Sequence, residues 1–550
     1  MDRLTQCASD VRPSLWASLD QPLPEWACVL GWCAATGVFV LIVLVLGGPS
    51  TVDSVESMYS TWAVAHGHLA CAFPATTTYA YTAPGYPLVS GAIAALTRVG
   101  SSIPFPSTAA LGPHCATALP AMSEWSSKTG ALSATVDIGY ISWLFLMAGA
   151  VAFLRAVGRG RCRWEPLTLI VLACLPPVWG AIETVFHPQD LMAMGLALGG
   201  LACVLRRRWA WAGVLLALAV LSQQFALLVA APIFVLAPRH RRLRFSVAAL
   251  GTAAVIALPL IGLGSGKVLR TLTYGSGDSS VTGGTLVTEL RLHGWVLAGT
   301  SRVLPIVLSM VLAWWLVRRL GAATVRSPLP LASLVALSLS LRLVFEENLR
   351  DSYYFMALAV ALVLLDVVCG RIRGPVVAWL ALVTLAHDVW PLNMFGAVSW
   401  GFGATEHLPQ VLIVLGIVIV LVDVARARVH WYRVAWLLVT VAAFATWPFT
   451  DEPFRTPLPK WFWQLVLVSI GMWLAAGPLV RFTREREAHL ARDATPPHGV
   501  IGSVVVPHDG HVGAGVNAPM VVPVEPIGQP TASSAGVALG HGHGHGSRTC

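Results

Sequence analysis

The sequence is dominated by long apolar runs separated by short turns that are rich in arginine. A helix that crosses the hydrocarbon core of a bilayer needs about 20 apolar residues, and many of these runs approach that length. Only 11% of the 550 residues are charged, whereas about 25% are charged in a typical soluble chain. The sequence therefore predicts an all-α, polytopic transmembrane helix bundle.

The apolar runs predict about fourteen spans. Residues 209–238 are divided into two short spans at Ser222–Gln224, because basic clusters lie at both ends, at 206–208 and 239–244. Two crossings keep both clusters on one side of the membrane, as the positive-inside rule requires. The expected spans are 26–47, 137–157, 166–183, 190–205, 209–222, 224–238, 245–263, 300–318, 328–344, 354–369, 374–391, 408–424, 434–449 and 461–480.

The arginine clusters predict the orientation of the bundle. With these spans, all the clusters fall on one side, so we expect that side and both chain termini to be cytoplasmic. The segment 51–136 has only Arg98 and Lys128 as cations, and we expect it to form a large first loop outside. The first apolar run follows a mixed polar segment, which predicts an uncleaved signal anchor.

Two domains are expected. Residues 1–487 form the membrane domain, and residues 488–550 form a cytoplasmic tail that is too poor in large apolar side chains to fold. The tail ends in GHGHGHGSRTC, whose histidines either bind metal ions or have only incidental affinity for them. These histidines are His541, His543 and His545.

Neither the cysteines nor the net charge point to a metal or nucleic acid site. The ten cysteines show no C-x-x-C or zinc spacing, and most lie in apolar runs. Cys71 and Cys115 fall in the same predicted outer loop, where we expect a disulfide; the alternative is two free thiols. The net charge of +9 is explained by membrane topology and does not predict a nucleic acid partner.

The remaining charges gather at the predicted outer face. Charged side chains within spans are costly and usually functional. An ion pump is expected to carry them through the middle of its spans, whereas here only Asp366 and Asp423 lie near inner ends. This distribution predicts a reaction at the outer face. The outer residues are Asp53, Glu56, Glu183, His187, Asp190, Arg302, Arg342, Glu346, Glu347, Arg350, Asp351, His387 and Asp388.

The first outer loop has helical signals of its own. Ser50 and Asp53 have the spacing of a capping box, so we expect a helix to begin there. Met58, Trp62 and Ala65 share one face of that helix. The stretch APGYPLVSGAIAALTRVG predicts a second short helix that lies against the membrane surface.

The ordered set of these features resembles GT-C membrane glycosyltransferases, in particular the actinobacterial branch with polyprenyl-phosphate-mannose-dependent mannosyltransferases. The resemblance covers about residues 26–370. It rests on Asp53, Tyr59 and APGYPL in the first loop, and on FHPQDLMAMGLALGGLACVLRRR, WAGVLLALAVLSQQFALLVAAP and ENLRDSYYF. Two departures stand out. Ser54 follows Asp53 where many relatives have a second acid, and SQQ stands where some relatives have lysine.

The resemblance implies transfer of a sugar, mannose in that branch, from a polyprenyl-phosphate donor to a glycolipid or polysaccharide acceptor of the cell envelope. It implies that Asp53 accepts the proton of the acceptor hydroxyl; the alternative role is a helix N-cap. Glu56, one turn later, either orients the acceptor or is solvated. A single base with direct attack predicts inversion at the anomeric carbon. The donor serves as substrate, so no cofactor is expected.

Cations at the outer face are the candidates for binding the donor phosphate. We expect Arg350 and Arg291 to clamp it, because a guanidinium can donate two hydrogen bonds to phosphate. The alternative is an interfacial anchor or an ion pair with a nearby carboxylate. His187, which is otherwise a helix cap, and Lys267 are further phosphate candidates.

Three polar side chains are candidates for contacts to the sugar or the acceptor. Gln189 adjoins His187, while Tyr353 and Tyr354 either stack on the sugar or belong to the aromatic belt at the membrane interface. The predicted cytoplasmic loops contain no D-x-D motif, which fits a donor without a nucleotide.

Two other functions stay open. A transporter or lipid flippase would explain the short broken pair at 209–238, because discontinuous helices are typical of transporter sites, although the chain shows no repeated halves. A non-catalytic relative that binds lipid-linked sugar is consistent with the displaced second acid. In every case membrane lipids are expected partners.

Overall fold

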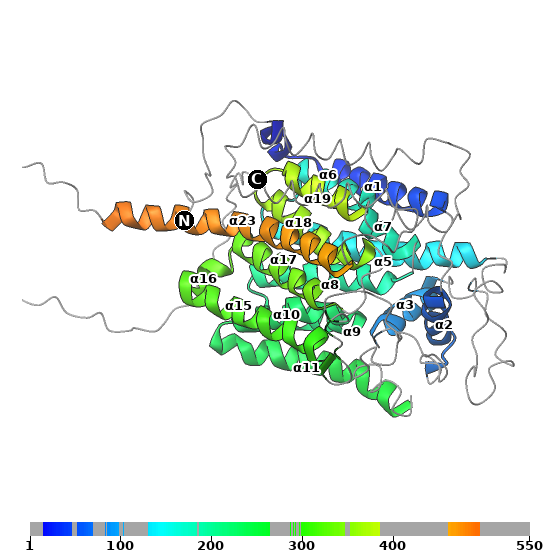
Figure 1. Cartoon of the computed structure of the whole chain (residues 1–550). Helices are drawn as coiled ribbons and strands as arrows, with labels where there is room; N and C mark the ends of the chain where they lie inside the picture. The colour runs from blue at the N-terminus through cyan, green and yellow to red at the C-terminus, as the bar shows by residue number, and fades with distance from the viewer. Residues whose placement is uncertain are drawn as a thin grey trace, which may run out of the picture. The chain divides into compact units, whose positions relative to one another are not determined.

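The computed structural model in Figure 1 describes residues 15–46, 52–69, 83, 85–97, 103, 130–183, 186–263, 287, 290, 292, 296–297, 299–346, 352–384 and 460–494. These residues are almost entirely helical, and their single β contact is a bridge between Pro22 and Cys162. The predicted all-α class is confirmed for this part of the chain. The first of two units ends at Thr483, and the second begins within the last helix.

Seven of the described helices are long and apolar enough to cross a membrane, or eight if one bent pair is counted as a span. The protein is therefore membrane-associated, while the count of about fourteen spans stays a prediction. The long helices are α1 (Glu25–Leu46), α5 (Ala131–Ala156), α8 (Pro188–Leu205), α11 (Arg239–Leu263), α15 (Leu304–Leu320), α17 (Pro328–Phe345) and α23 (Lys460–Ala494).

Shorter elements connect or accompany these helices. The apolar ones are α3 (Gly85–Thr97), α9 (Trp209–Ser222), α10 (Leu227–Leu236), α18 (Met356–Val368) and α19 (Gly374–Thr384), and α2 (Val52–Ala65) is a more polar helix that contains Asp53 and Glu56. Between them lie η1 (Leu15–Asp20), η5 (Gln224–Ala226), α16 (Ala322–Val325), η7 (Ser352–Phe355) and a π-helical turn, η6 (Gly299–Val303). The helix break predicted at Ser222–Gln224 is confirmed, because α9 ends at Ser222 and Gln223 is extended.

Three boundaries differ from the sequence prediction. The span expected at 166–183 consists of α6 (Trp164–Cys174) and α7 (Pro176–Glu183), which meet at a 49° bend. Two successive prolines begin α7, and proline has no N–H to continue the helical ladder. Helix α11 starts at Arg239, so the basic cluster lies within its first turns. Helix α23 continues to Ala494, beyond the expected domain boundary at residue 487.

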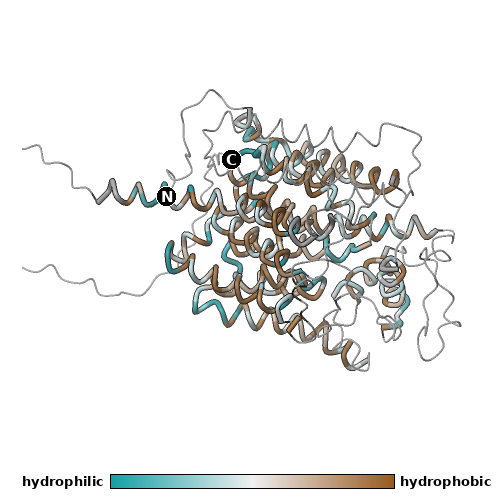
Figure 2. The backbone as a smooth tube through the Cα atoms, in the orientation of Figure 1, coloured by the Kyte–Doolittle hydropathy of each residue, from teal (hydrophilic) through white to brown (hydrophobic). Residues whose placement is uncertain are grey.

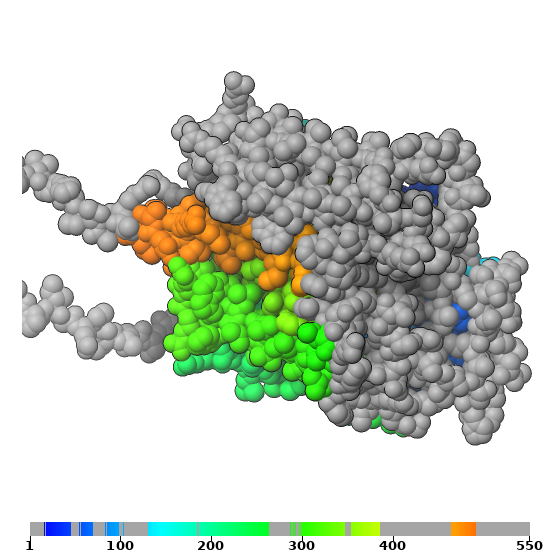
Figure 3. All heavy atoms as spheres, in the orientation of Figure 1, coloured from blue at the N-terminus to red at the C-terminus, as the bar shows by residue number. Residues whose placement is uncertain are grey.

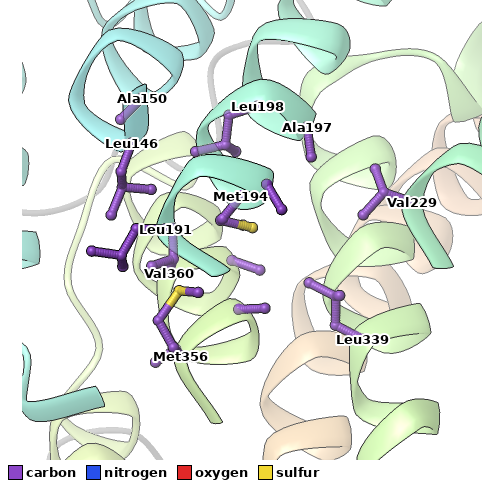
Figure 4. Packing of buried hydrophobic residues seen from close by; sticks show 14 of the residues in the cluster. Leu146, Ala150, Leu191, Met194, Ala197, Leu198, Val229, Leu339, Met356 and Val360 are labelled. Carbon is purple, nitrogen blue, oxygen red and sulfur yellow. The ribbon is translucent and has the colours of Figure 1, made fainter. Parts of the chain in front are cut away.

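Helix α8 is the centre of the described bundle. It is buried along nearly its whole length and packs against α5, α9 and α18. Figure 4 shows side chains from these and neighbouring helices converging around it: Leu146, Ala150, Leu191, Met194, Ala197, Leu198, Val229, Leu339, Met356 and Val360. A helix that is apolar on every side belongs in such a position.

Helices α5 and α8 approach each other backbone to backbone. A Cβ atom on Gly195 would lie 2.2 Å from the carbonyl oxygen of Phe145, and a Cβ on Gly149 would lie 2.0 Å from that of Gly195. Small residues at helix contacts allow this close approach inside membranes, where packing replaces the hydrophobic effect as the driving force. Gly195 therefore fixes the position of the central helix.

Apolar side chains also cover the outer surface of several helices. Leu30 of α1, Leu250 of α11 and Val311 of α15 are exposed, and Figure 2 shows hydrophobic residues along the length of α11 with polar residues at its start. Such surfaces are suited to lipid rather than to water.

Arginines of the described turns after α5, α8, α16 and α18 lie at one end of the bundle, which we call the arginine-rich end. A Cβ on Gly370 would lie 2.8 Å from the guanidinium of Arg159, so the turns after α5 and α18 meet. Arg207 acts electrostatically on Arg326, which brings the α8–α9 turn to the start of α17. Arg373 donates to the carbonyl oxygen of Leu474 in α23 over 3.0 Å. Successive helices therefore alternate in direction.

Gly195→Ala is expected to lower the free energy of unfolding by about 1–3 kcal/mol, because the added methyl group forces α5 and α8 apart. Gly251→Ala is the matched control, since a Cβ there meets nothing within 4 Å and alanine is the better helix former by about 0.5–1 kcal/mol. Melting temperatures in detergent measure both. A similar change in melting temperature in the two variants would contradict the close backbone contact between α5 and α8.

Candidate functional site

A group of buried polar side chains lies where α8 begins and where α9 and α17 end; we call this the polar end. Asp190, in the first turn of α8, is only 3% exposed. Its carboxylate accepts a 2.5 Å hydrogen bond from Nε2 of Gln223, the residue that terminates α9. A buried carboxylate needs such partners, because the low-dielectric interior disfavours its charge.

The last turn of α17 supplies an opposite charge. Nε of Arg342 donates to Oε2 of Glu346 over 2.8 Å, and its guanidinium lies 5.3 Å from the ring centre of Phe225 in η5. Arg342 and Asp190 also interact electrostatically, as do His187 and Asp190. The charges at the start of α8 and at the end of α17 therefore compensate one another. We call His187, Gln189, Asp190, Gln223, Arg342 and Glu346 the Asp190 cluster.

Gln189 leaves a hydrogen-bond acceptor unused within the described structure. Its Nε2 lies 3.1 Å from Nδ1 of His187. Its Oε1 is buried and accepts a hydrogen bond from none of the described residues. An unsatisfied buried acceptor costs about 1–3 kcal/mol, so a ligand that donates to this oxygen gains that amount on binding.

The Asp190 cluster lies below the ends of the longer helices. Helix α9 has 14 residues, which rise about 21 Å, whereas a hydrocarbon core is about 30 Å thick. Helix α5 has 26 residues and extends about 39 Å. The break at Gln223 therefore sets these polar groups back from the end of the bundle that α5 reaches.

A second contact holds the segment that follows the break. The guanidinium of Arg302 donates to the side-chain oxygen of Gln224. This bond positions the guanidinium of Arg302. Arg302 is exposed and belongs to the π-helical turn η6, a conformation that is frequent at functional sites.

The two helices predicted in the first loop are confirmed as α2 and α3, and they pack on each other. The hydroxyls of Thr61 and Ser90 are 3.0 Å apart. A Cβ on Gly85, at the start of α3, would lie 2.7 Å from Cβ of Leu221 in α9. Leu260 of α11 packs against Val64 and Leu88. Helices α2 and α3 therefore join the bundle at the polar end.

The structure describes some of the predicted site residues and not others. Asp53 and Glu56 lie in the first turns of α2, where the helix was expected, and Tyr353 and Tyr354 lie in η7, which packs against α7. The side chains of Asp53, Glu56 and Tyr353 are outside the described structure. So are the residues Lys267, Arg291, Arg350, Cys71, Cys115, Glu347, Asp351, His387, Asp388, Asp423, His541, His543 and His545, and the spans expected at 408–424 and 434–449.

The sequence identified His187 and Gln189 as candidate site residues, but it did not identify the other members of the Asp190 cluster as such. Asp190 and Arg342 were recognised only as outer-face charges, and Gln223 only as a break. One signal in the sequence could have found this contact. A carboxylate and a guanidinium are each costly to bury in an apolar span, which predicts that Asp190 and Arg342 lie close together. The contact between Arg342 and Glu346 was not predicted.

No family model matches the chain, and no curated protein is similar to it. Among the described residues, no three His, Cys, Asp or Glu side chains lie together as a metal site.

Asp190→Asn is expected to lower the free energy of unfolding by about 1.5–3 kcal/mol, because the charged hydrogen bond to Gln223 and the compensation of Arg342 are lost. The control is Glu25→Gln at the arginine-rich end, whose pair with Arg161 is about 60% exposed on both sides and 3.4 Å long. An exposed pair contributes at most about 1 kcal/mol. Equal shifts in melting temperature would contradict a buried, compensated Asp190.

Proposed function

We propose that this protein is a GT-C-type membrane glycosyltransferase that transfers a sugar, mannose in the branch it resembles, from a polyprenyl-phosphate donor to a glycolipid or polysaccharide acceptor of the cell envelope. The observation that supports this proposal most directly is the Asp190 cluster, a set of ionic and amide side chains recessed at one end of an otherwise apolar bundle. The first-loop helix that contains Asp53 joins the bundle at the same end.

The position of the cluster suits a donor that stays in the membrane. Withdrawing a polyprenyl chain from lipid costs about 0.8 kcal/mol for each CH2 group, so the reactive phosphate must be met at the headgroup plane. Polar groups just beneath that plane can contact the phosphate and sugar while apolar helices exclude water. We further propose a multi-pass topology in which the polar end is extracytoplasmic and both termini are cytoplasmic, from the positive-inside rule.

In the proposed reaction, Asp53 acts as general base. The acceptor hydroxyl oxygen attacks the anomeric carbon of the donor, and the bond from that carbon to the phosphate oxygen breaks. The hydroxyl proton passes to the Asp53 carboxylate, which must lie within about 3 Å of it, and polyprenyl phosphate leaves as the anion. Direct attack inverts the anomeric configuration, and Glu56 orients the acceptor.

Cations at the polar end stabilise the departing phosphate. Arg302 suits this role because it is exposed and Gln224 positions its guanidinium. Arg350, Arg291, His187 and Lys267 stay candidates for the same phosphate. Gln189 suits a sugar hydroxyl, because its buried oxygen lacks a donor among the described residues. Tyr353 and Tyr354 are candidates for stacking on the sugar.

One observation favours a second function, a lipid flippase. Helices α9 and α10 are short and are separated by the extended Gln223, which donates to the buried Asp190, and by the turn η5. Discontinuous helices of this kind are typical of transporters. A flippase would move lipid-linked sugar between leaflets without breaking a glycosidic bond.

Asp53→Asn is expected to reduce sugar transfer by about 100-fold or more, because the base contributes roughly that factor. The assay supplies radiolabelled polyprenyl-phosphate mannose to membranes that contain the full-length protein and measures label in the glycan fraction. Product analysis is expected to show inversion at the anomeric carbon.

Asp20→Asn serves as control, because it makes the same chemical change at the arginine-rich end. Unchanged transfer by the Asp53 variant, or a product of retained configuration, would falsify the proposed mechanism. Translocation of labelled lipid without transfer by the wild type would favour the flippase, and binding without either activity would favour a non-catalytic relative.

Arg302→Gln is expected to raise the donor KM by about tenfold or more, since a charged hydrogen bond contributes about 1.5–3 kcal/mol. Arg302→Lys should recover part of that loss, because it restores the charge but not the planar fork. Initial rates of sugar transfer at varied donor concentration give the donor KM of the two variants. A normal KM in the glutamine variant would remove Arg302 from the phosphate site.

A further inference from the structure

The arginine-rich end has two groups of arginines, which differ in whether carboxylates of the protein pair with them. Near α1, α6 and α18, four of its arginines have carboxylate partners within the protein, and Glu165 and Asp366 are fully buried in these contacts. The ion pairs are Arg155–Glu165, Arg159–Asp20, Arg161–Glu25 and Arg373–Asp366.

A second group of arginines lacks such partners, and we call it the basic patch. The sequence has no Asp or Glu from residue 191 to 277 or from 292 to 345. In the part of the chain that the structure describes, no carboxylate pairs with a member of the basic patch. Its members are Arg206, Arg207, Arg208, Arg239, Arg241, Arg242, Arg244, Arg318 and Arg326.

Helix packing brings these arginines to one region. A Cβ on Gly213 of α9 would lie 2.4 Å from the carbonyl oxygen of Phe245, so the starts of α9 and α11 are adjacent. Arg242 donates to the carbonyl oxygens of Val235 and Ala237 and so caps α10. Helix α10 in turn packs against α15, and α11, α15 and α16 share one face in Figure 3.

The like charges in the basic patch act on one another. Burial and the neighbouring Arg207 both lower the pKa of Arg326. A group of cations without counter-charge is unfavourable, and an anion bound among them relieves the repulsion.

Aromatic side chains place the basic patch at headgroup depth. The guanidinium of Arg318 lies 5.2 Å from the ring centre of Trp314, and that of Arg319 lies 5.8 Å from Trp315. The two indoles are 51% and 47% exposed, and tryptophan concentrates at the membrane interface. Exposed apolar residues of α11 and α15 continue from this point along the bundle.

We propose that the basic patch binds the headgroups of anionic phospholipids in the leaflet that it faces. Lipid supplies the missing negative charge, and its acyl chains have an apolar surface directly beside the arginines. A soluble phosphate would use the charge but leave that surface without a partner. Each arginine near an anionic membrane surface contributes about 1 kcal/mol, so the patch binds such lipid in preference to a zwitterionic one.

The test is native mass spectrometry of the full-length protein in micelles with equal amounts of phosphatidylglycerol and phosphatidylcholine. The wild type should retain phosphatidylglycerol preferentially. Arg239→Gln, Arg244→Gln and Arg318→Gln combined should weaken that binding by about fivefold for each arginine removed, which is about 1 kcal/mol. Arg161→Gln is the control, because Arg161 has Glu25 as its partner, and it should leave the preference unchanged.

Equal retention of the two lipids by the wild type, or an unchanged preference in the triple variant, overturns the proposal. Displacement of the lipid by inorganic phosphate would assign the patch to a soluble anion and overturns it as well. If the triple variant does not fold, retention of phosphatidylglycerol by the wild type is measured at increasing ionic strength instead. Binding to headgroups must weaken as salt screens the charges. Retention that is independent of salt is the contradicting result.

Discussion

Hydrocarbon solvates neither a backbone amide nor a charge, and this constraint governs the whole structure. Every segment in lipid must satisfy its own backbone hydrogen bonds, so the described chain is helical. Every charge must reach an end of the bundle or find a partner. Glu165 shows the second solution. Although fully buried, it receives hydrogen bonds from Trp32, Arg155 and the backbone of Arg161.

The same constraint gives the two ends different chemistry. At the arginine-rich end, one group of cations is paired with carboxylates within the protein, and another forms the basic patch. At the polar end, Asp190 and Arg342 lie among amide side chains beneath the ends of longer helices. Polar groups recessed in this way can contact the head of a membrane-anchored substrate while apolar helices exclude water. The proposed glycosyl transfer and the proposed lipid binding therefore use opposite ends of one bundle.

Local signals in the sequence predicted much of the fold. The basic clusters on both sides of residues 209–238 required a break, and α9 ends at Ser222. Partners far apart in sequence were not predictable: Asp190 and Gln223 meet only because α8 and α9 pack side by side. The ion pair between Arg342 and Glu346 was not predicted either, although both residues lie in one turn. Helix α17 continues to Phe345, which puts Arg342 one helical turn from Glu346.

The central claim is that the polar end and the arginine-rich end face opposite sides of the membrane. Cysteine labelling tests it most directly, with His66→Cys in α2 and Arg207→Cys in the α8–α9 turn, both exposed positions. A membrane-impermeant maleimide added to intact cells should label position 66 above the wild-type background. Position 207 should react only after the membrane is permeabilised. Labelling of both positions from the same side would contradict the account.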